Sequence, residues 1–243
     1  FKQKTAYEML RSLVGSEMCI RDRAKTSEDK RKSSFFLVER DTPGVRIGRT
    51  ERKLGQRGSN TTEVFLDDVN VPAEHLLGNE GEGFLIAMKD FDMSRPAIGA
   101  QALGIAEGAF EILLQALEEK SRPGTSLPSY QILQAILADS AILIEASRGL
   151  VFRAALLHDE GRNDTKLASM AKCFASDAAM KITTEVIDAI QILEGFGSPR
   201  QSDAGRMFRD AKLTQIFEGT NQIQRLVIAR QTVRERMGRS LKE

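Results

Sequence analysis

From Gly81 to the C-terminus, apolar residues recur at the spacing of amphipathic α-helices, and Pro or Gly interrupts the pattern at intervals. The pattern predicts a short helix from Gly81 that carries Phe84 and Phe91, and a second helix capped by Asp92 or Ser94. Further helices are predicted over residues 129–158, 163–193, 202–215 and 221–237. Long amphipathic helices with short connections are typical of an antiparallel bundle.

The apolar faces of these helices predict the core of the bundle. The residues expected to face it are Ile98, Ala102, Ile105, Ala109, Leu113 and Leu117; Ile132, Ile136, Ser140, Leu143, Ala146, Leu150 and Ala154; Leu167, Met170, Ala171, Phe174, Ala178 and Ile182; and Ile223, Leu226 and Val227. We interpret the Ala and Met positions as packing residues and not as cofactor contacts.

Residues 24–78 predict part of a β-sheet. A charged loop is expected over residues 24–34, and short strands over 35–39, 45–47 and 63–66. Three or four strands are too few for an independent β-sandwich, which indicates a partial domain. The predicted fold class is mainly α, with a C-terminal antiparallel helical bundle of the four-helix-bundle type over residues 79–243, preceded by the partial β-domain over residues 24–78.

Residues 1–23 do not fit this organisation. The run from Ser12 to Asp22 resembles a translated sequencing-adapter read-through, and we therefore exclude residues 1–23 from the fold argument as a non-native segment. On this interpretation the chain is a fragment, and its native N-terminus is absent from the sequence.

Composition excludes several classes of function. A chain of 243 residues with a net charge of +1 lacks the basic excess that nucleic-acid or membrane-surface binding requires. Cys19, Cys173, His75 and His158 show no metal-ligand spacing, and no apolar run reaches the length of a membrane span. Two cysteines without a disulfide framework favour a reducing compartment.

The strongest candidate for chemistry is the run Ile-Phe-Glu-Gly-Thr-Asn-Gln-Ile-Gln-Arg over residues 216–225. The apolar residues before Glu218 destabilise its anion, whereas the N-terminus of the following helix stabilises it, and opposed effects of this kind tune a base. Gly219 lets a backbone approach a ligand closely, and Thr220 or Asn221 can cap the next helix. The alternative is a plain junction between helices with an exposed Glu.

A second candidate is Asp92-Met93-Ser94-Arg95-Pro96, at the start of a predicted helix. Arg95 and the local amide groups would form a small positive region suited to a phosphate or carbonyl group. The alternative is that Asp92 only caps the helix and Arg95 is solvated.

The run from Phe217 to Arg225, preceded by Arg209-Asp210-Ala211-Lys212, resembles the C-terminal signature of the acyl-CoA dehydrogenases, which are flavoenzymes that desaturate acyl-CoA thioesters. The resemblance covers about Phe35 to Arg230. It implies that Glu218 removes the pro-R α-proton while a hydride leaves the β-carbon for N5 of FAD, and that Asp92 and Arg95 bind the acyl-CoA.

The residue before Arg95 also discriminates within this family. Branched-chain members such as those acting on isovaleryl-CoA place their base as a Glu at this position and lack the Glu of the C-terminal motif. Ser94 stands here and Glu218 is present, which favours the straight-chain type.

The same resemblance implies contacts with FAD. The stretch from Gln191 to Gly197 is similar to a family motif that lies against the FAD of a neighbouring subunit, with Glu194 in place of its first glycine. Lys120 and Pro123 stand where the family usually has an Arg on the FAD pyrophosphate and a Phe near the flavin. The implied FAD-binding residues are Gln131, Gln191, Gly195, Gly197, Gly219, Thr220 and Gln222.

Partners and location follow from the resemblance alone. They are an acyl-CoA substrate, a homo-oligomer (a tetramer or dimer), electron-transfer flavoprotein as the electron acceptor, and a mitochondrial matrix or bacterial cytoplasm. Two alternatives stay open: an acyl-CoA oxidase that shares the base but returns electrons to oxygen, and a non-catalytic helical assembly module of the same fold. The sequence does not indicate the acyl-chain length of the substrate.

Overall fold

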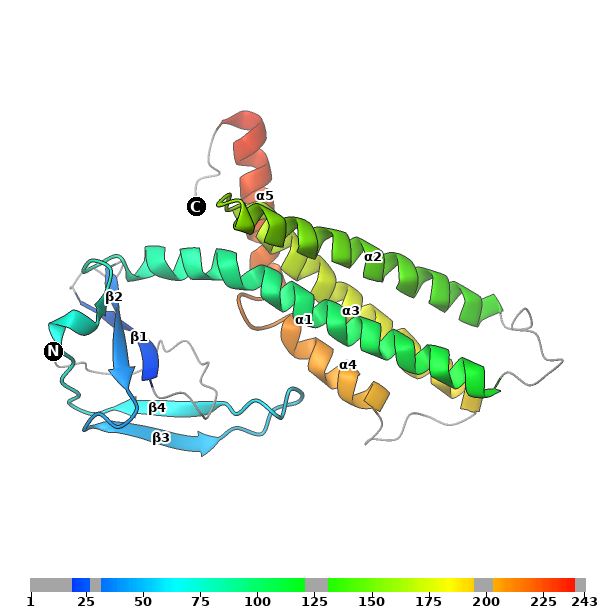
Figure 1. Cartoon of the computed structure of the whole chain (residues 1–243), viewed down its shortest axis with the longest axis horizontal. Coiled ribbons are helices and arrows are strands. Elements are labelled where there is room, and N and C mark those ends of the chain that lie inside the picture. Colours follow the sequence, from blue (N-terminus) through cyan, green and yellow to red (C-terminus); the bar gives the residue numbers. More distant parts are fainter. Residues whose placement is uncertain (1–18, 27–31, 121–130, 195–202, 239–243) are drawn as a thin grey trace. The chain divides into compact units, whose positions relative to one another are not determined.

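The computed structural model describes residues 19–26, 32–120, 131–194 and 203–238 (Figure 1). The chain divides into two compact units, Phe1–Asp90 and Phe91–Glu243. The predicted boundary after residue 78 lies earlier in the chain than this division, because the first turns of the long first helix pack within the β unit. There, the Gly81 amide donates a hydrogen bond to the Ser34 hydroxyl at 2.9 Å.

The first unit holds two small antiparallel sheets. One has the strand order β1 (Cys19–Lys25), β2 (Ser33–Glu39) and β5 (Leu76–Leu77), and the other pairs β3 (Val45–Thr50) with β4 (Thr62–Leu66). A short 3₁₀ helix, η1 (Ala73–His75), precedes β5. Val38 and Val64 are the buried centre of a small apolar cluster in this unit.

The strand β1 differs from the prediction. We expected a loop over residues 24–34 and excluded residues 1–23, but Cys19 to Arg23 form the greater part of β1 and pair with β2. The physical reason is that strand pairing uses backbone N–H and C=O groups, which every non-Pro residue has, so an open strand edge accepts many sequences. The three strands predicted farther along the chain correspond to β2, β3 and β4.

The first helix, α1 (Gly83–Lys120), is continuous, with Pro96 inside it. The predicted break before Asp92 is therefore wrong. A proline removes one helical hydrogen bond and crowds the carbonyl four residues earlier, which is that of Asp92. Side-chain contacts of Asp92 with Arg95 and Thr165 hold this turn, so tertiary contacts override the local signal.

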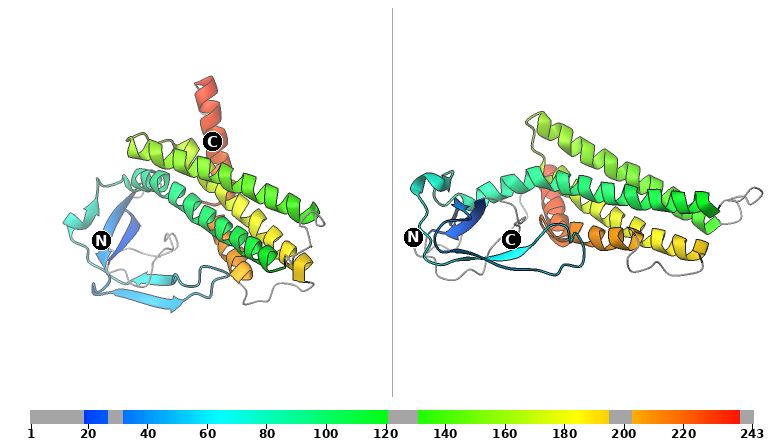
Figure 2. Two further views of the ribbon diagram at one scale, coloured as in Figure 1. Left: turned by 45° about the vertical axis from the view of Figure 1, so that its right-hand side comes forward. Right: turned by 60° about the horizontal axis from the view of Figure 1, so that its bottom comes forward.

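The second unit is an antiparallel helical bundle, as predicted. It contains α1 from Phe91 onward, α2 (Gln131–Asp159), α3 (Thr165–Glu194), α4 (Asp203–Thr214) and α5 (Asn221–Met237). Figures 1 and 2 show α1, α2 and α3 running side by side. The helix caps agree with the sequence signals: Asp164 Oδ1 accepts from the Leu167 amide at 2.9 Å, and Thr220 caps α5.

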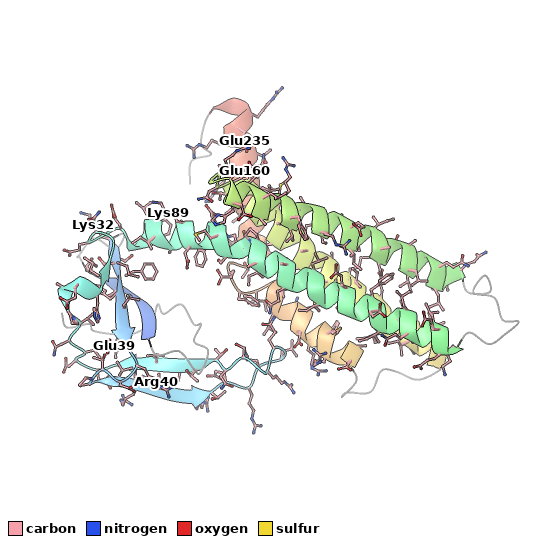
Figure 3. All side chains as sticks on the ribbon, in the orientation of Figure 1. Lys32, Glu39, Arg40, Lys89, Glu160 and Glu235 are labelled. Atoms are coloured by element: carbon pink, nitrogen blue, oxygen red, sulfur yellow. The ribbon has the colours of Figure 1, made fainter. Side chains whose placement is uncertain are left out.

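The helix α3 lies at the centre of the bundle and packs against α2, α4 and α5. Most of its buried residues are small or β-branched, which lets neighbouring backbones approach closely. The α3 side chains with no exposed surface are Ala171, Lys172, Ala175, Ser169, Ser176, Ala179, Ile182, Thr183, Val186 and Ala189. An ion pair from Lys166 on α3 to Glu235 links the first turns of α3 to α5, and Figure 3 labels Glu235 on α5.

The predicted face holds for α1, for α3 except Phe174, which is 37% exposed, and for most of α2, but not for α5. On α2, Ile132 and Ala146 are exposed, and the buried residues are Leu133, Ser140, Ile144, Ser147, Val151 and Ala154. On α5, Ile223 and Leu226 are exposed and the buried residues are Asn221 and Gln224. Apolar residues occur on more than one side of both helices, so periodicity alone does not select the buried side.

Length and composition make α1 a possible membrane span among the described helices, against our expectation from the sequence. However, α1 places Ala102, Ala109 and Leu113 in the bundle core with no exposed surface. A helix in the middle of a bundle passes the same test of length and hydropathy, so this finding is weak evidence for a membrane.

Neighbouring residues on α2 provide a test of the observed face. Leu133 is fully buried and Ile132 is 66% exposed. We expect Leu133→Ala to lower the free energy of unfolding by about 2–5 kcal/mol because it leaves a cavity. Ile132→Ala is the matched control and should cost less than about 1 kcal/mol. Urea denaturation of both variants makes the comparison, and a larger loss for Ile132→Ala would contradict the assigned face.

Candidate active site

Glu218 lies in the turn between α4 and α5, in an unusual backbone conformation. Its φ is +55° and that of Gly219 is +88°. The Phe217 amide donates to the Leu213 carbonyl at 3.2 Å, and the Asn221 amide donates to the Gln215 carbonyl at 3.0 Å, closing the turn. A positive φ costs free energy for a residue with a side chain and is typical of functional sites when the surroundings enforce it.

The turn brings Glu218 to residues that the sequence singled out on α1. The Ser94 hydroxyl donates to Glu218 Oε2 at 2.8 Å. Arg95 Nη1, beside it in sequence, donates to Asp92 Oδ1 at 2.8 Å, and the second oxygen of Asp92 accepts from Thr165 Oγ1 at 2.6 Å. The structure therefore gathers the predicted base and both predicted substrate-binding residues at one place in the bundle.

Arg95 is the buried cation of this cluster. It is 5% exposed, its guanidinium lies 5.6 Å from the centre of the Phe91 ring, and its Nε has no hydrogen-bond partner among the described residues. Burial lowers the pKa of Arg95, whereas the charges of Asp92 and Glu218 oppose this effect. Arg95 is therefore not a solvated surface residue, and its Nε is a donor that a ligand can engage.

Sequence reasoning missed two side chains on the inner side of the turn. Lys172 on α3 is fully buried, and its Nζ donates to the Gly219 carbonyl at 2.9 Å and to Asn221 Oδ1 at 2.8 Å. Gln224 on α5 is also fully buried, and its Nε2 donates to the carbonyls of Gly219 at 3.0 Å and Glu218 at 3.2 Å. A polar residue on an otherwise apolar helix face was the available signal for Lys172.

Asn221 extends this polar contact surface along α3. Its Nδ2 donates to Ser176 Oγ at 2.8 Å and to Asp177 Oδ1 at 2.7 Å. Asp177 also forms an ion pair with Arg225 on α5. Burial raises the pKa of the neighbouring Cys173 thiol. The first turn of α5 is thus fastened to α3 through side-chain hydrogen bonds as well as packing.

Of the remaining candidate residues, Thr220 and Gln222 lie next to the Glu218 turn and the others lie elsewhere. Thr220 accepts from the Ile223 amide as a helix cap, and Gln222 is exposed. Gln131 and Gln191 are exposed at the opposite end of the bundle, where α2 begins and α3 ends (Figure 1). Along α3, the rise of the helix puts about 28 Å between Lys172 and Gln191. Gly195, Gly197 and Pro123 lie outside the described residues.

The fold and the site together define a helical-bundle domain that presents the Glu218 carboxylate at one end. The comparison with family models identifies the domain: residues 81–233 match the model described as "Acyl-CoA dehydrogenase, C-terminal domain". The chain belongs to the acyl-CoA dehydrogenase family.

Similar proteins include a cyclohexane-1-carbonyl-CoA dehydrogenase of Geobacter metallireducens, which is 62% identical over 87% of this chain and 55% of its own length. The solved butyryl-CoA dehydrogenase of Megasphaera elsdenii is 40% identical, with a TM-score of 0.81 over 89% of this chain and 56% of the other. A chain in the structure titled as the electron transferring flavoprotein of Acidaminococcus fermentans is 45% identical, with a TM-score of 0.80 over 89% of this chain and 56% of that one. The chain spans about half the length of the curated relatives it matches.

Substitution of Gly219 tests whether the turn is needed in its observed form. A Cβ at this position would lie 2.5 Å from Gln224 Nε2, and the φ of +88° is unfavourable for any L side chain. We expect Gly219→Ala to lower the free energy of unfolding by about 1–3 kcal/mol and to displace the turn. Gly149→Ala on α2, which meets open space, is the control. Equal stability of the two variants in denaturant would contradict the strained turn.

The buried ammonium predicts a pH dependence of stability. Desolvation lowers the pKa of Lys172 from 10.5 to about 8, partly opposed by Cys173 and Asp177. Between these pH values the unfolded chain binds more protons than the folded one, so stability from this group rises with pH. Relative to Lys172→Met, the wild type should gain up to about 3 kcal/mol from pH 7 to 10.5, since one pKa unit corresponds to about 1.4 kcal/mol.

Denaturation of both proteins at several pH values measures this difference. The Cys173 thiol is common to both proteins, so its titration largely cancels in the comparison. A difference that does not change between pH 7 and 10.5 would show that the lysine is not buried as an ammonium.

Proposed function

We propose that the chain carries the catalytic base and part of the acyl-CoA site of an FAD-dependent acyl-CoA dehydrogenase. The observation that carries the proposal is the Glu218 carboxylate, held in a positive-φ turn against Ser94 and beside the buried Asp92–Arg95 pair. The reaction is α,β-dehydrogenation of an acyl-CoA thioester. Glu218 would accept the α-proton and bound FAD would accept a hydride from the β-carbon, leaving an enoyl-CoA.

The residues around Glu218 divide the work of proton removal. Glu218 Oε2 accepts the Ser94 hydrogen bond in the resting site, which orients the carboxylate. The positive charge of Arg95 lies close enough to interact with Glu218 and supports negative charge in this region as the α-carbon loses its proton. Asp92 holds Arg95 in place and accepts from Thr165, so the cation is fixed before substrate arrives.

FAD would supply the electron acceptor for the β-hydride. Gly219, Thr220 and Gln222 lie beside the base at one end of the bundle, whereas Gln131 and Gln191 lie exposed at the other end. Lys172, beside the turn, and Gln191 are about 28 Å apart along α3. This separation suits contacts with two FAD molecules better than contacts with one. Each FAD would then lie between two copies of the chain, which supports a homo-oligomer.

The substrate we favour is cyclohexane-1-carbonyl-CoA, because the relative of that name is 62% identical to this chain. Its α-carbon is a ring carbon with one hydrogen, and proton removal by Glu218 would give a cyclohexene-1-carbonyl-CoA. Butyryl-CoA is the straight-chain alternative, supported by the similarity to the Megasphaera elsdenii enzyme. Electron-transfer flavoprotein is the proposed acceptor, and the bacterial relatives favour a bacterial cytoplasm over a mitochondrial matrix.

The anaerobic visible spectrum of the purified, FAD-supplemented protein tests this function. We expect cyclohexane-1-carbonyl-CoA to bleach the flavin, with butyryl-CoA slower. Glu218→Gln should bind flavin but lose at least about 100-fold in the rate of bleaching, because the base is gone. Glu235→Gln, an exposed carboxylate in an ion pair on α5, is the control and should bleach like the wild type.

Two outcomes would decide against the proposal. Flavin that is bound but reduced by neither thioester would contradict the substrate class, and equal bleaching by Glu218→Gln would contradict the base. Rapid reoxidation in air with release of hydrogen peroxide would assign the protein to the acyl-CoA oxidases instead.

A further inference from the structure

The carbonyl groups of Glu218 and Gly219 are held from within the bundle by two fully buried side chains. Lys172 Nζ donates to Gly219 O at 2.9 Å, and Gln224 Nε2 donates to Gly219 O at 3.0 Å and to Glu218 O at 3.2 Å. We call Lys172 and Gln224 together the carbonyl clamp. The two carbonyl groups belong to the successive peptides on either side of Gly219. Glu218 and Gly219 both have positive φ, so rotation of either peptide breaks hydrogen bonds of the clamp.

Helix capping does not explain the clamp. Thr220 already caps α5, and the Asn221 amide already closes the turn on the Gln215 carbonyl at 3.0 Å. Burying an ammonium group to donate to a carbonyl is also unfavourable, because the charge loses its contact with water. The unfavourable burial of Lys172 at the Gly219 carbonyl indicates that the exact position of the turn matters.

Charge neutralisation within α3 does not explain Lys172 either. The nearest carboxylate on its own helix, Asp177, is already paired with Arg225. The charged and titratable groups that act on Lys172 are Cys173 and Asp177 from α3, Arg95 from α1 and Glu218 from the turn. Its hydrogen bonds go to the turn and to Asn221, the first residue of α5.

We propose that Lys172 and Gln224 are positioning residues for the Glu218 base: they hold the two peptide groups on either side of Gly219 from the inner side, so that the carboxylate points at Ser94 and the substrate. This inference rests on the proposed function for its kinetic consequence, but its structural part stands on the contacts alone. The clamp touches neither substrate nor cofactor. It acts by fixing the one backbone conformation in which Glu218 reaches the cluster on α1.

The structural part is tested by amide hydrogen exchange in the purified protein. Lys172→Met keeps the length and apolar stem of the side chain but removes its donors. We expect exchange of the Asn221 amide, which closes the turn, to become at least tenfold faster, while amides in the middle of α3 stay protected. Lys181→Met, an exposed lysine on the same helix, should change neither.

The kinetic part is tested by flavin reduction at saturating acyl-CoA. Misplacement of the base should slow reduction about 10- to 100-fold, with the apparent substrate dissociation constant within about threefold of the wild type. A deuterium at the α-carbon should then give a larger isotope effect than in the wild type, because proton removal limits the rate more strongly. A variant that is only less well folded loses active protein without a change in the isotope effect.

Gln224→Met keeps the test valid if Lys172→Met does not fold. It removes the second donor of the clamp together with an Oε1 that has no partner among the described residues, and leaves the lysine charge in place. Unchanged exchange at Asn221 in the variant that folds overturns the clamp. An unchanged isotope effect with a rate that falls only in proportion to folded protein overturns its role in catalysis. If the wild type itself fails to reduce flavin, the proposed function fails, and the exchange data still decide on the clamp.

Discussion

The geometry of the candidate site depends on the buried ammonium group of Lys172 on α3, the central helix of the bundle. Lys172 has no exposed surface, and its hydrogen bonds go to the turn that carries Glu218 and to the first residue of α5. A buried charge is tolerated only where its protons have acceptors, so the position of α3 relative to the turn is narrowly defined. Lys172 fixes the Gly219 carbonyl and the start of α5, and Gln224 holds the Glu218 carbonyl beside them.

Packing of α3 makes such a contact rigid enough to matter. Most of its buried residues are small or β-branched, which lets α2, α4 and α5 approach closely around it, and its buried Ala positions have almost no exposed surface. A close-packed interior has few alternative arrangements. Glu218, the proposed base, therefore lies in a turn, where its backbone can adopt a positive φ, while the residues that hold the turn lie on helices. Ser94 and Arg95 reach the same site from a third helix, α1.

Helix positions and the Glu218 motif could be predicted from the sequence, because caps and breakers are local and the motif is short. The first core residue of α2 could not, since Ile132 and Leu133 are adjacent and both apolar, and only packing decides between them. Pro96 was mistaken for a helix start because the contacts that hold its turn, from Asp92 to Arg95 and Thr165, are formed by the fold. Lys172 and Gln224 were not singled out, since their partners include backbone carbonyls that sequence patterns do not show.

The groups that orient Glu218, the proposed base, are separate from the group that its carboxylate contacts on α1. Polar groups of α3 and α5 hold the turn from the inner side, and the carboxylate on the outer side is bonded to the Ser94 hydroxyl, a neutral and replaceable donor. The hydrogen bonds of Lys172 and Gln224 in the turn go to backbone carbonyl groups and not to the carboxylate oxygens of Glu218. Lys172 and Gln224 therefore fix the backbone of Glu218 through its turn, while the carboxylate meets the neutral Ser94 hydroxyl on α1.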